Sequence, residues 1–333
     1  MRSRAPDPVP VAKARKQTMR SPFRLVPAAA AACLMSACGG GGGSPPDSGT
    51  PPVTSSSGVA VDGYLQFATV VCDSNDDGVV DAGERGAGTS GSGRFAFSPA
   101  CDAPLIVFGG TNADTGLPFG GRLRAPAGAS VVSPLTTLLA EGLAAPELLA
   151  SLALPADTLL ASTDPAALGG GVLVEPALYR ATLAVQQVLQ STTMLLARLA
   201  GQDGADAVQT VYARVARSTA AALAGSSPLS DGTTFDPAVV GRIVEDAVAA
   251  VTATYPFTAA VDAASLAQVV SAALGVQASR ILVADESQLA ATVSAGQLST
   301  EVADFVEMHR AELSGAPGEG TAALATASHS IAA

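Results

Sequence analysis

Residues 68–84 read ATVVCDSNDDGVVDAGE, in which an apolar, β-prone run passes directly into an acidic loop. Val70 and Val71 are β-branched and favour an extended strand. The Asp, Asn, Ser and Gly residues that follow Cys72 favour turns. The stretch therefore predicts a strand that leads into an acidic loop, without the helix that precedes a true EF-hand loop.

The twelve residues 73–84 place oxygen atoms where a calcium-binding loop of EF-hand type places them. Gly78 permits the sharp turn in the middle of the loop. The expected ligands are Asp73, Asn75, Asp77, the carbonyl oxygen of Val79, Asp81 directly or through a water, and Glu84 through both carboxylate oxygens. The alternative is an acidic surface turn, but the four ligand carboxylates repel one another unless a cation neutralises them. Calcium is the predicted cofactor.

Three further β-prone runs accompany this stretch, separated by Gly, Asp and Pro. They cover residues 59–65, 94–97 and 105–108, and their short length is typical of strands joined by turns. We predict a small β-sandwich over residues 58–127.

The order of motifs in this region resembles the carboxypeptidase-regulatory-like and collagen-adhesin B-type sandwich modules of bacterial surface proteins. The resemblance rests on Val61-Asp62-Gly63, the run 68–70, the acidic loop and the run 91–95. It implies a seven-stranded, prealbumin-like domain that serves as a stalk, spacer or binding module. Calcium would stiffen one loop between its strands.

The chain from Ser133 onward is predicted to be helical. Ser133 is a suitable N-cap with Pro134 at the first helical position, and Asp236 and Asp262 are comparable start signals. Helices are expected at residues 176–200, 205–224, 237–254, 263–283 and 300–313. The predicted fold class is α+β, with the small N-terminal sandwich followed by an Ala-rich helical bundle over residues 128–314 and a flexible tail over 315–333.

Each predicted helix carries one apolar stripe. The stripe of residues 237–254 consists of Val240, Ile243, Val244, Ala247 and Val251. We interpret such stripes as core; the alternative is a cleft for an apolar ligand or a partner helix. A different surface is expected at Gln186, Gln187 and Gln190, which we interpret as a solvated face.

The N-terminal region resembles a bacterial lipoprotein signal. Arg20 and Arg24 precede an apolar run that ends at Met35-Ser36-Ala37-Cys38, which resembles a lipobox. The resemblance implies cleavage before Cys38, a diacylglyceryl group on its sulfur, and, since Gly39 follows, the outer membrane of a Gram-negative bacterium. The alternatives are an ordinary secretory signal and a short buried helix. Residues 1–37 are thus the expected signal, with translation expected to start at Met19, and residues 38–57 a Gly/Ser/Pro-rich tether.

Export leaves two cysteines, Cys72 and Cys101, in an oxidising compartment. A disulfide between them is the expected outcome, and two unpaired buried thiols are the alternative. After residue 38 we expect no apolar run long enough to span a bilayer, so the lipid would be the anchor.

The mature chain would keep 11 arginines, no lysine and 28 acidic residues, a formal net charge of −17. Such a surface repels phosphate, so nucleic acid is not expected as a partner. The absence of lysine excludes a Walker phosphate loop, a Schiff-base lysine and a Ser-x-x-Lys nucleophile.

Other signs of enzyme chemistry are sparse. Asp114-Thr115-Gly116 occurs once and is typical of a turn, so it does not supply the two carboxylates of an aspartic protease. His309 with Glu312 offers two metal ligands on one helix, but no second Glu-x-x-His pair completes that site. A Gly-x-Ser-x-Gly elbow is absent from the sequence.

These observations predict a calcium-binding, lipid-anchored envelope protein without catalytic residues, acting as a binding or scaffold module. Its expected partners are the membrane, through the N-terminal lipid, and an unidentified protein or cell-surface ligand. The alternatives are a secreted or envelope hydrolase or accessory enzyme with a structural calcium site, and a calcium-responsive sensor element.

Overall fold

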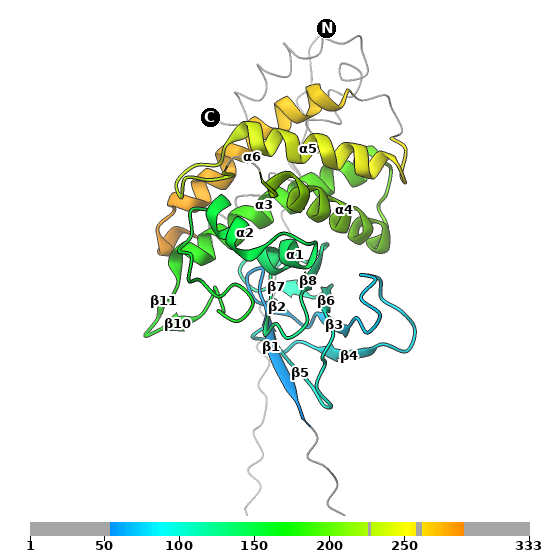
Figure 1. The fold of residues 1–333 in the computed structure, drawn as a ribbon, viewed down its shortest axis with the longest axis vertical. Helices are drawn as coiled ribbons and strands as arrows, with labels where there is room; N and C mark the ends of the chain where they lie inside the picture. Colours follow the sequence, from blue (N-terminus) through cyan, green and yellow to red (C-terminus); the bar gives the residue numbers. More distant parts are fainter. Residues whose placement is uncertain (1–53, 226–227, 258–261, 290–333) are drawn as a thin grey trace, which may run out of the picture. The chain divides into compact units, whose positions relative to one another are not determined.

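The structure is a computed structural model that describes residues 54–225, 228–257 and 262–289 (Figure 1). Most of its strands lie between residues 56 and 132, and its helices follow from residue 134 onward. The predicted α+β class is therefore confirmed at this level.

One sheet has three strands in the order β5-β1-β9. Its central strand β1 (Ser56–Ala60) runs antiparallel to β5 (Arg94–Phe97), with Ser56 opposite Phe97. On its other side β1 runs parallel to β9 (Val131–Val132). The third strand thus comes from residues beyond 127, where we expected the β-structured part to end.

The second sheet has four antiparallel strands in the order β4-β3-β6-β8. The strands are β3 (Thr69–Cys72), β4 (Arg85–Gly88), β6 (Leu105–Phe108) and β8 (Arg122–Ala125). Strands β2 (Leu65–Gln66) and β7 (Thr111–Asn112) form a separate two-stranded antiparallel sheet. Every predicted β-run contains a strand. The edge strand β4 was not predicted because its sequence, RGAG, has low β-propensity.

The long helices begin and end within two residues of the predicted positions. They are α3 (Pro176–Leu199), α4 (Ala205–Leu223), α5 (Pro237–Thr252) and α6 (Ala263–Val283). The side chain of Asp236 accepts a hydrogen bond from the Ala238 N–H, and that of Asp262 accepts one from the Ser265 N–H, as expected of N-caps. The predicted helix 300–313 and the tail lie outside the described residues.

The prediction that the chain is wholly helical after Ser133 was wrong in one region. Ser133 caps α1 (Pro134–Ala140) through a capping box with Thr136, and α2 (Ala145–Ser151) follows. A hairpin of β10 (Leu168–Gly169) and β11 (Val172–Leu173) then interrupts the helices. Gly170 and Gly171 both have positive φ, 64° and 92°, as a tight two-residue hairpin turn requires.

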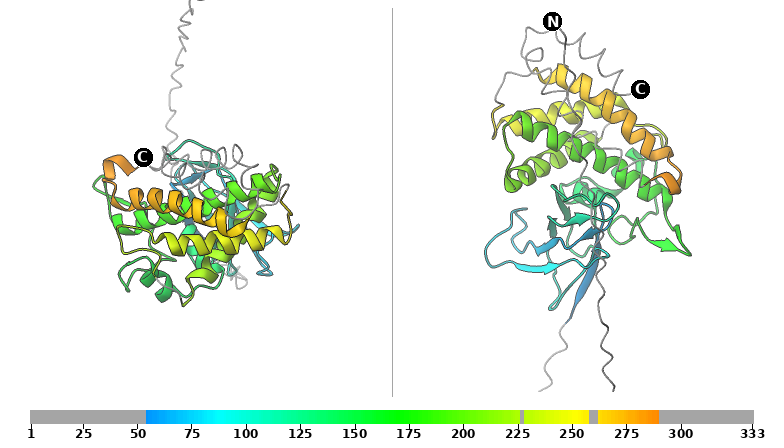
Figure 2. Two further views of the ribbon diagram at one scale, coloured as in Figure 1. Left: turned by 90° about the horizontal axis from the view of Figure 1, so that it is seen from above. Right: turned by 180° about the vertical axis from the view of Figure 1, so that it is seen from behind.

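A continuous hydrophobic core joins strands and helices. Helix α1 contacts β8 on one side and α3 and α4 on the other, so it lies between the sheets and the longer helices (Figures 1 and 2). The stripe of α5 that we interpreted as core is buried along its whole length. The boundary predicted between residues 127 and 128 stays a prediction, since no gap in this core marks it.

Helix α6 is long and apolar enough to cross a membrane by length and composition, which our sequence reading did not expect. About two thirds of its most apolar window, 67%, is buried against the rest of the protein. Core helices of water-soluble proteins pass the same test, so the finding is weak evidence for a membrane span.

Candidate metal centre

The acidic loop 73–84 connects β3 to β4, so it is entered from a strand as predicted. Asp73 follows Cys72 at the end of β3 and is completely buried. Its Oδ2 accepts a hydrogen bond from the Gly78 N–H at 3.0 Å, and its Oδ1 accepts one from the Asp77 N–H at 3.3 Å. Gly78 has φ +73°, which a residue with a side chain adopts only with strain. Asp73 and Gly78 thus fold the first half of the loop around one carboxylate.

Three of the predicted ligands meet at the exposed side of the loop. The Asn75 Nδ2 donates hydrogen bonds to Oδ2 of Asp77 and Oδ2 of Asp81, each at 3.0 Å. The Asp77 Oδ1 also accepts a hydrogen bond from the Val79 N–H at 2.7 Å. Two carboxylates that would repel each other are therefore held together by one amide group.

Glu84 closes the loop. Its Oε1 accepts a hydrogen bond from the Ser74 N–H at 2.8 Å, and its Oε2 accepts one from the Asp81 N–H at 3.0 Å. Glu84, the last residue of the loop, is thereby joined to Ser74, its second residue. Within the described ranges, no group of three or more His, Cys, Asp and Glu side chains converges closely enough to hold a metal ion. The structure thus brings Asn75, Asp77 and Asp81 together, while Asp73 and Glu84 bind backbone N–H groups.

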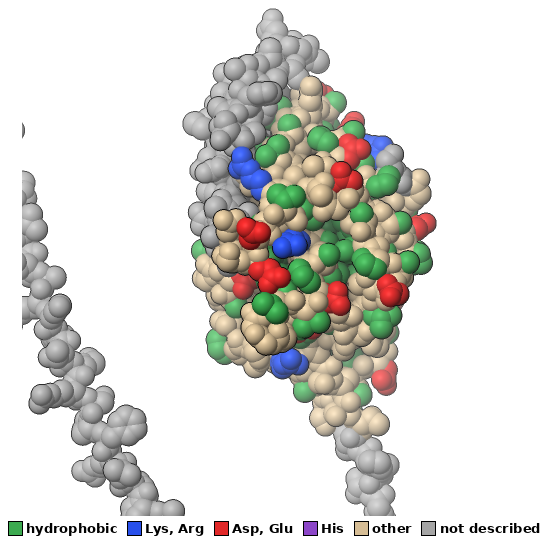
Figure 3. Space-filling model, turned by 90° about the vertical axis from the view of Figure 1, so that its left-hand side faces the viewer, with side chains coloured by type: hydrophobic (Ala, Val, Ile, Leu, Met, Phe, Trp, Pro, Cys, Tyr) green, Lys and Arg blue, Asp and Glu red, His purple; other side chains and the backbone are tan. Residues whose placement is uncertain are grey.

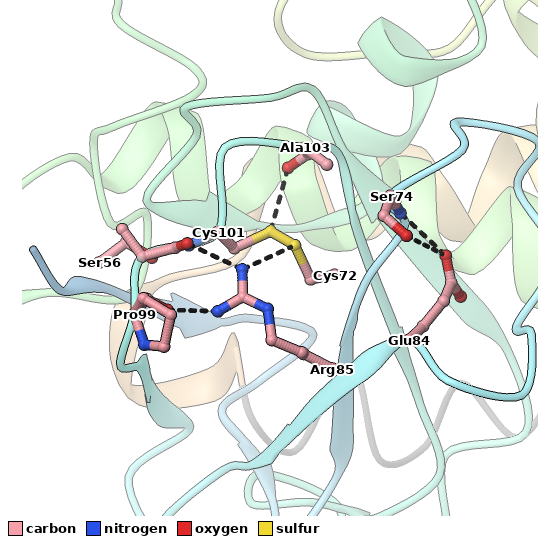
Figure 4. Close-up of a disulfide and its surroundings, with 9 residues drawn as sticks. Ser56, Cys72, Ser74, Glu84, Arg85, Pro99, Cys101 and Ala103 are labelled. Carbon is pink, nitrogen blue, oxygen red and sulfur yellow. Dashed lines mark hydrogen bonds between the residues drawn. A yellow bond between two sulfur atoms is a disulfide. The ribbon is translucent and has the colours of Figure 1, made fainter. Parts of the chain in front are cut away.

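Both ends of the loop are attached to the same segment, residues 99–101 (Figure 4). Cys72, which precedes the loop, forms a disulfide with Cys101, the pair expected from the sequence. Arg85, which follows the loop, donates hydrogen bonds to the carbonyl oxygens of Pro99, at 2.5 Å, and Ala100, at 2.8 Å. The separation of the two ends is therefore fixed independently of any ligand inside the loop.

Arg124 on β8 supports the loop from the protein interior and was not among the predicted site residues. Its Nη2 donates to Oδ2 of Asp73 at 3.1 Å and to Oδ1 of Asp76 at 3.2 Å. Its Nη1 donates to Oε1 of Glu141 at 3.2 Å. Glu141, at the C-terminus of α1, also accepts from the Nε of Arg217 on α4 at 2.9 Å. One sign was present in the sequence: Asp76 is an acidic residue at a loop position that the ligand pattern does not use.

A second polar cluster is buried between the strands and α3, and it overturns one sequence interpretation. Gln186 and Gln187 are buried and do not form a solvated face, and Gln190 is only partly exposed. The Gln186 Nε2 donates to Oδ2 of Asp62 at 3.0 Å, and its Oε1 accepts from the Tyr212 hydroxyl at 2.7 Å. Gln186 was misread because its buried partners Asp62 and Tyr212 are distant in the sequence.

Asp62 is the most strongly perturbed acid of this cluster. Its pKa is raised to about 7, chiefly by burial; a hydrogen bond with Asn112 lowers the pKa, the negative charge of Asp114 raises it, and a hydrogen bond with Gln186 lowers it. Asp114 accepts a hydrogen bond from the Tyr179 hydroxyl. Its Asp-Thr-Gly sequence forms a turn as predicted, in which the Asn112 carbonyl oxygen accepts from the Gly116 N–H at 2.8 Å.

Asp164 lies in a surface recess of about 430 Å³. Its Oδ2 accepts a hydrogen bond from the Tyr64 hydroxyl at 3.1 Å, and its Oδ1 accepts one from the Ala166 N–H. Burial, and then the charge of Asp164, raise the pKa of Tyr64 to about 12. Arg94 and three serines also line this recess.

The surface shows no large patch of a single kind on the face drawn in Figure 3, where acidic, basic and hydrophobic side chains are interspersed. No protein-family model matches the chain, and it matches neither a curated protein nor a solved structure.

Proposed function

We propose that the protein is a calcium-binding, lipid-anchored envelope protein that acts as a non-catalytic binding or scaffold module. The observation that carries the proposal is the meeting of Asn75, Asp77 and Asp81 in a loop whose conformation is set by Asp73 and Glu84. Calcium prefers oxygen ligands in a flexible geometry, and all six predicted donors are oxygen atoms.

The donor chemistry fits the ion, although the carboxylates do not yet converge on one point. Asn75 presents its amide nitrogen to Asp77 and Asp81, and rotation of the amide group would present its oxygen in the same place. Asp73 and Glu84 would hold the ion from opposite ends of the loop, together with the Val79 carbonyl oxygen. A bound ion would neutralise the repulsion among these carboxylates and stiffen the connection between β3 and β4.

The lipid anchor is proposed on Cys38, which lies outside the described residues, as does the signal that precedes it. The proposed location is the outer membrane, and the proposed partner is an unidentified protein or cell-surface ligand. A prealbumin-like sandwich is also proposed. The three-stranded and four-stranded sheets support it, since together they supply seven strands.

A scaffold role is favoured over a hydrolase because the two acids of the buried cluster are engaged in structural contacts. Asp62 lies in the buried cluster with Gln186, and Asp114 is bound by Tyr179. The hydrolase alternative would have to use the recess with Arg94 and Asp164, where Tyr64 already binds the carboxylate. If the protein shows a hydrolytic activity and substitution of Asp164 leaves that activity unchanged, the hydrolase alternative is removed.

Calorimetric titration of the chain from residue 39 with calcium tests the proposal. We expect one ion per chain, with binding lost in the double variant Asp77→Asn/Asp81→Asn. Each substitution removes one anionic ligand from the proposed site, and both side chains are exposed. The matched control is Asp102→Asn/Asp157→Asn, which removes two exposed acids outside the loop. No heat of binding up to millimolar calcium, or equal binding by both double variants, would refute the proposal.

The same titration separates a permanent structural ion from a sensor element. Extracellular calcium modules bind with dissociation constants of about 10⁻⁴–10⁻³ M, whereas permanent sites bind much more tightly. A value in the weaker range would favour the sensor.

A further inference from the structure

The ionic contacts of Arg124 extend from the acidic loop to the helices. We infer that Arg124 is a positioning residue that couples calcium in the loop to the packing of α1 and α4. The inference rests on the proposed calcium binding and adds a pathway by which the helices respond to it. Three carboxylates and two arginines take part: Asp73, Asp76, Glu141, Arg124 and Arg217.

The backbone of Arg124 is fixed, so its side chain is aimed by the fold. The Arg124 N–H donates to Oγ1 of Thr137 at 2.9 Å, and the Arg124 carbonyl oxygen accepts from the Thr136 hydroxyl at 3.0 Å. Both threonines belong to the first turn of α1 and are buried. These hydrogen bonds tie strand β8 to α1 at this point, so a change at the loop would reach α1 through the guanidinium group.

The guanidinium group itself is buried between its partners. The Arg124 side chain is 7% exposed, and the side chains of Asp73 and Glu141 are 0% and 3% exposed. Buried charges of this kind are costly unless paired, so Arg124 compensates an acid on each side. A Cβ atom at Gly78 would lie 3.1 Å from Cζ of Arg124, which shows how closely the loop backbone approaches the cation.

Of the three ion pairs of Arg124, the one with Asp76 can break most easily. Asp76 is 69% exposed, lies at a loop position outside the predicted ligand set, and can transfer its carboxylate to water at little cost. A calcium ion held by Asp73, Asp77 and Asp81 would repel the guanidinium group. Since Glu141 contacts Nη1 while the loop acids contact Nη2, Arg124 is expected to weaken its contact with Asp76 and strengthen that with Glu141.

This shift would tighten the helical part of the network. Glu141 caps the C-terminus of α1 and receives Arg217 from α4, so a stronger Arg124–Glu141 contact restrains both helices. The sign of the coupling is thus defined: calcium should stabilise the end of α1 and the middle of α4, not only the loop.

Amide hydrogen exchange of the full mature chain, with calcium and with a chelator, tests this coupling. In the unmodified protein we expect calcium to slow exchange at residues 137–143 and 213–219, by fivefold or more if the coupling has the usual strength. In Arg124→Gln, calcium should still slow exchange in residues 74–84, and the effect on the two helical segments should disappear. The matched control is Arg242→Gln, which removes the same charge from an exposed position on α5; among the described residues Arg242 takes part in no ion pair.

A second variant, Glu141→Gln, keeps the Arg124–Asp73 contact and removes the acceptor charge on the helix side. It should still bind one calcium ion, with an affinity reduced by the coupling that it loses, and it should lose the helical response, which keeps the test valid if Arg124→Gln does not fold. A helical response that survives unchanged in Glu141→Gln, or is lost equally in Arg242→Gln, would overturn the coupling while calcium binding stands. An unmodified protein that binds no calcium in calorimetry would instead remove the proposed function on which the inference rests.

Discussion

The buried carboxyl group of Asp62 yields a stability prediction that can be worked out in sign and size. Its pKa is about 7 in the folded protein and 3.8 when unperturbed, a difference of about 3 units. A carboxyl group whose folded pKa is raised contributes fully to stability below its unfolded pKa, and this contribution is lost as pH rises through the folded pKa. At 1.36 kcal/mol per unit, the ionised group costs about 4 kcal/mol above pH 7 relative to pH below 4.

The perturbation is Asp62→Asn, which keeps the shape and the acceptor for Gln186 but cannot ionise. Comparison with the unmodified protein cancels the titration of the other acids. We expect the variant to be more stable by up to about 4 kcal/mol at pH 8, with the difference shrinking steadily between pH 7 and pH 4. Asp102→Asn is the control, since this exposed acid lies outside the cluster.

Urea unfolding at intervals from pH 4 to pH 8 measures this difference, with the slope of the unfolding free energy against urea checked for constancy. A difference between variant and unmodified protein that does not change with pH would show that Asp62 does not titrate in this range. An Asn variant that is less stable at pH 8 would show that the ionised carboxylate is stabilised by Asn112 and Gln186 more than burial disfavours it.

Three further predictions concern single contacts. The disulfide closes a separation of 29 residues between Cys72 and Cys101, which should stabilise the fold by about 3.6 kcal/mol in the chain-entropy model. The variant Cys72→Ala/Cys101→Ala should therefore unfold at a lower urea concentration, and an unchanged urea midpoint would contradict this prediction. Gly78→Ala should cost about 1–2 kcal/mol in chemical unfolding because of its positive φ, whereas the same change at Gly204, an N-cap with negative φ, should cost less. Tyr212→Phe leaves the buried Gln186 oxygen without its donor and should cost about 1–3 kcal/mol; Tyr255→Phe is the partly exposed control.

Patterns among neighbouring residues were sufficient to predict the elements whose conformation depends on contacts within a short stretch of sequence. The long helices could be placed because their apolar residues recur every three or four positions and because Asp236 and Asp262 mark their starts. The acidic loop could be placed because ligand spacing within twelve residues is itself a local pattern. The turn at Asp114-Thr115-Gly116 was read correctly for the same reason.

Contacts between distant residues could not be predicted in this way. Arg124 meets Asp73 across 51 residues, and Gln186 meets Asp62 across 124. Nothing local distinguishes Gln186 from a glutamine on a helix surface, so its burial emerges only once α3 lies against the strands. Strand β4 is a related case, since pairing with β3 and not its own propensity makes RGAG extended.

The two halves of the acidic loop differ in a way that bears on the affinity of the proposed calcium site. Asp73 is completely buried and held by Arg124 and two backbone N–H groups, whereas Asn75, Asp77 and Asp81 are exposed. The buried half is ordered beforehand, which reduces the entropy lost on binding. It is also already neutralised by an internal cation, so an ion gains less from Asp73 than from a free carboxylate. With Glu84 engaged by backbone N–H groups as well, the strongest new attraction is left to the exposed residues, where salt screens it. The loop therefore favours a weak, salt-dependent site over a permanent structural ion, and a tight, salt-independent site would show that Arg124 leaves Asp73 when calcium binds.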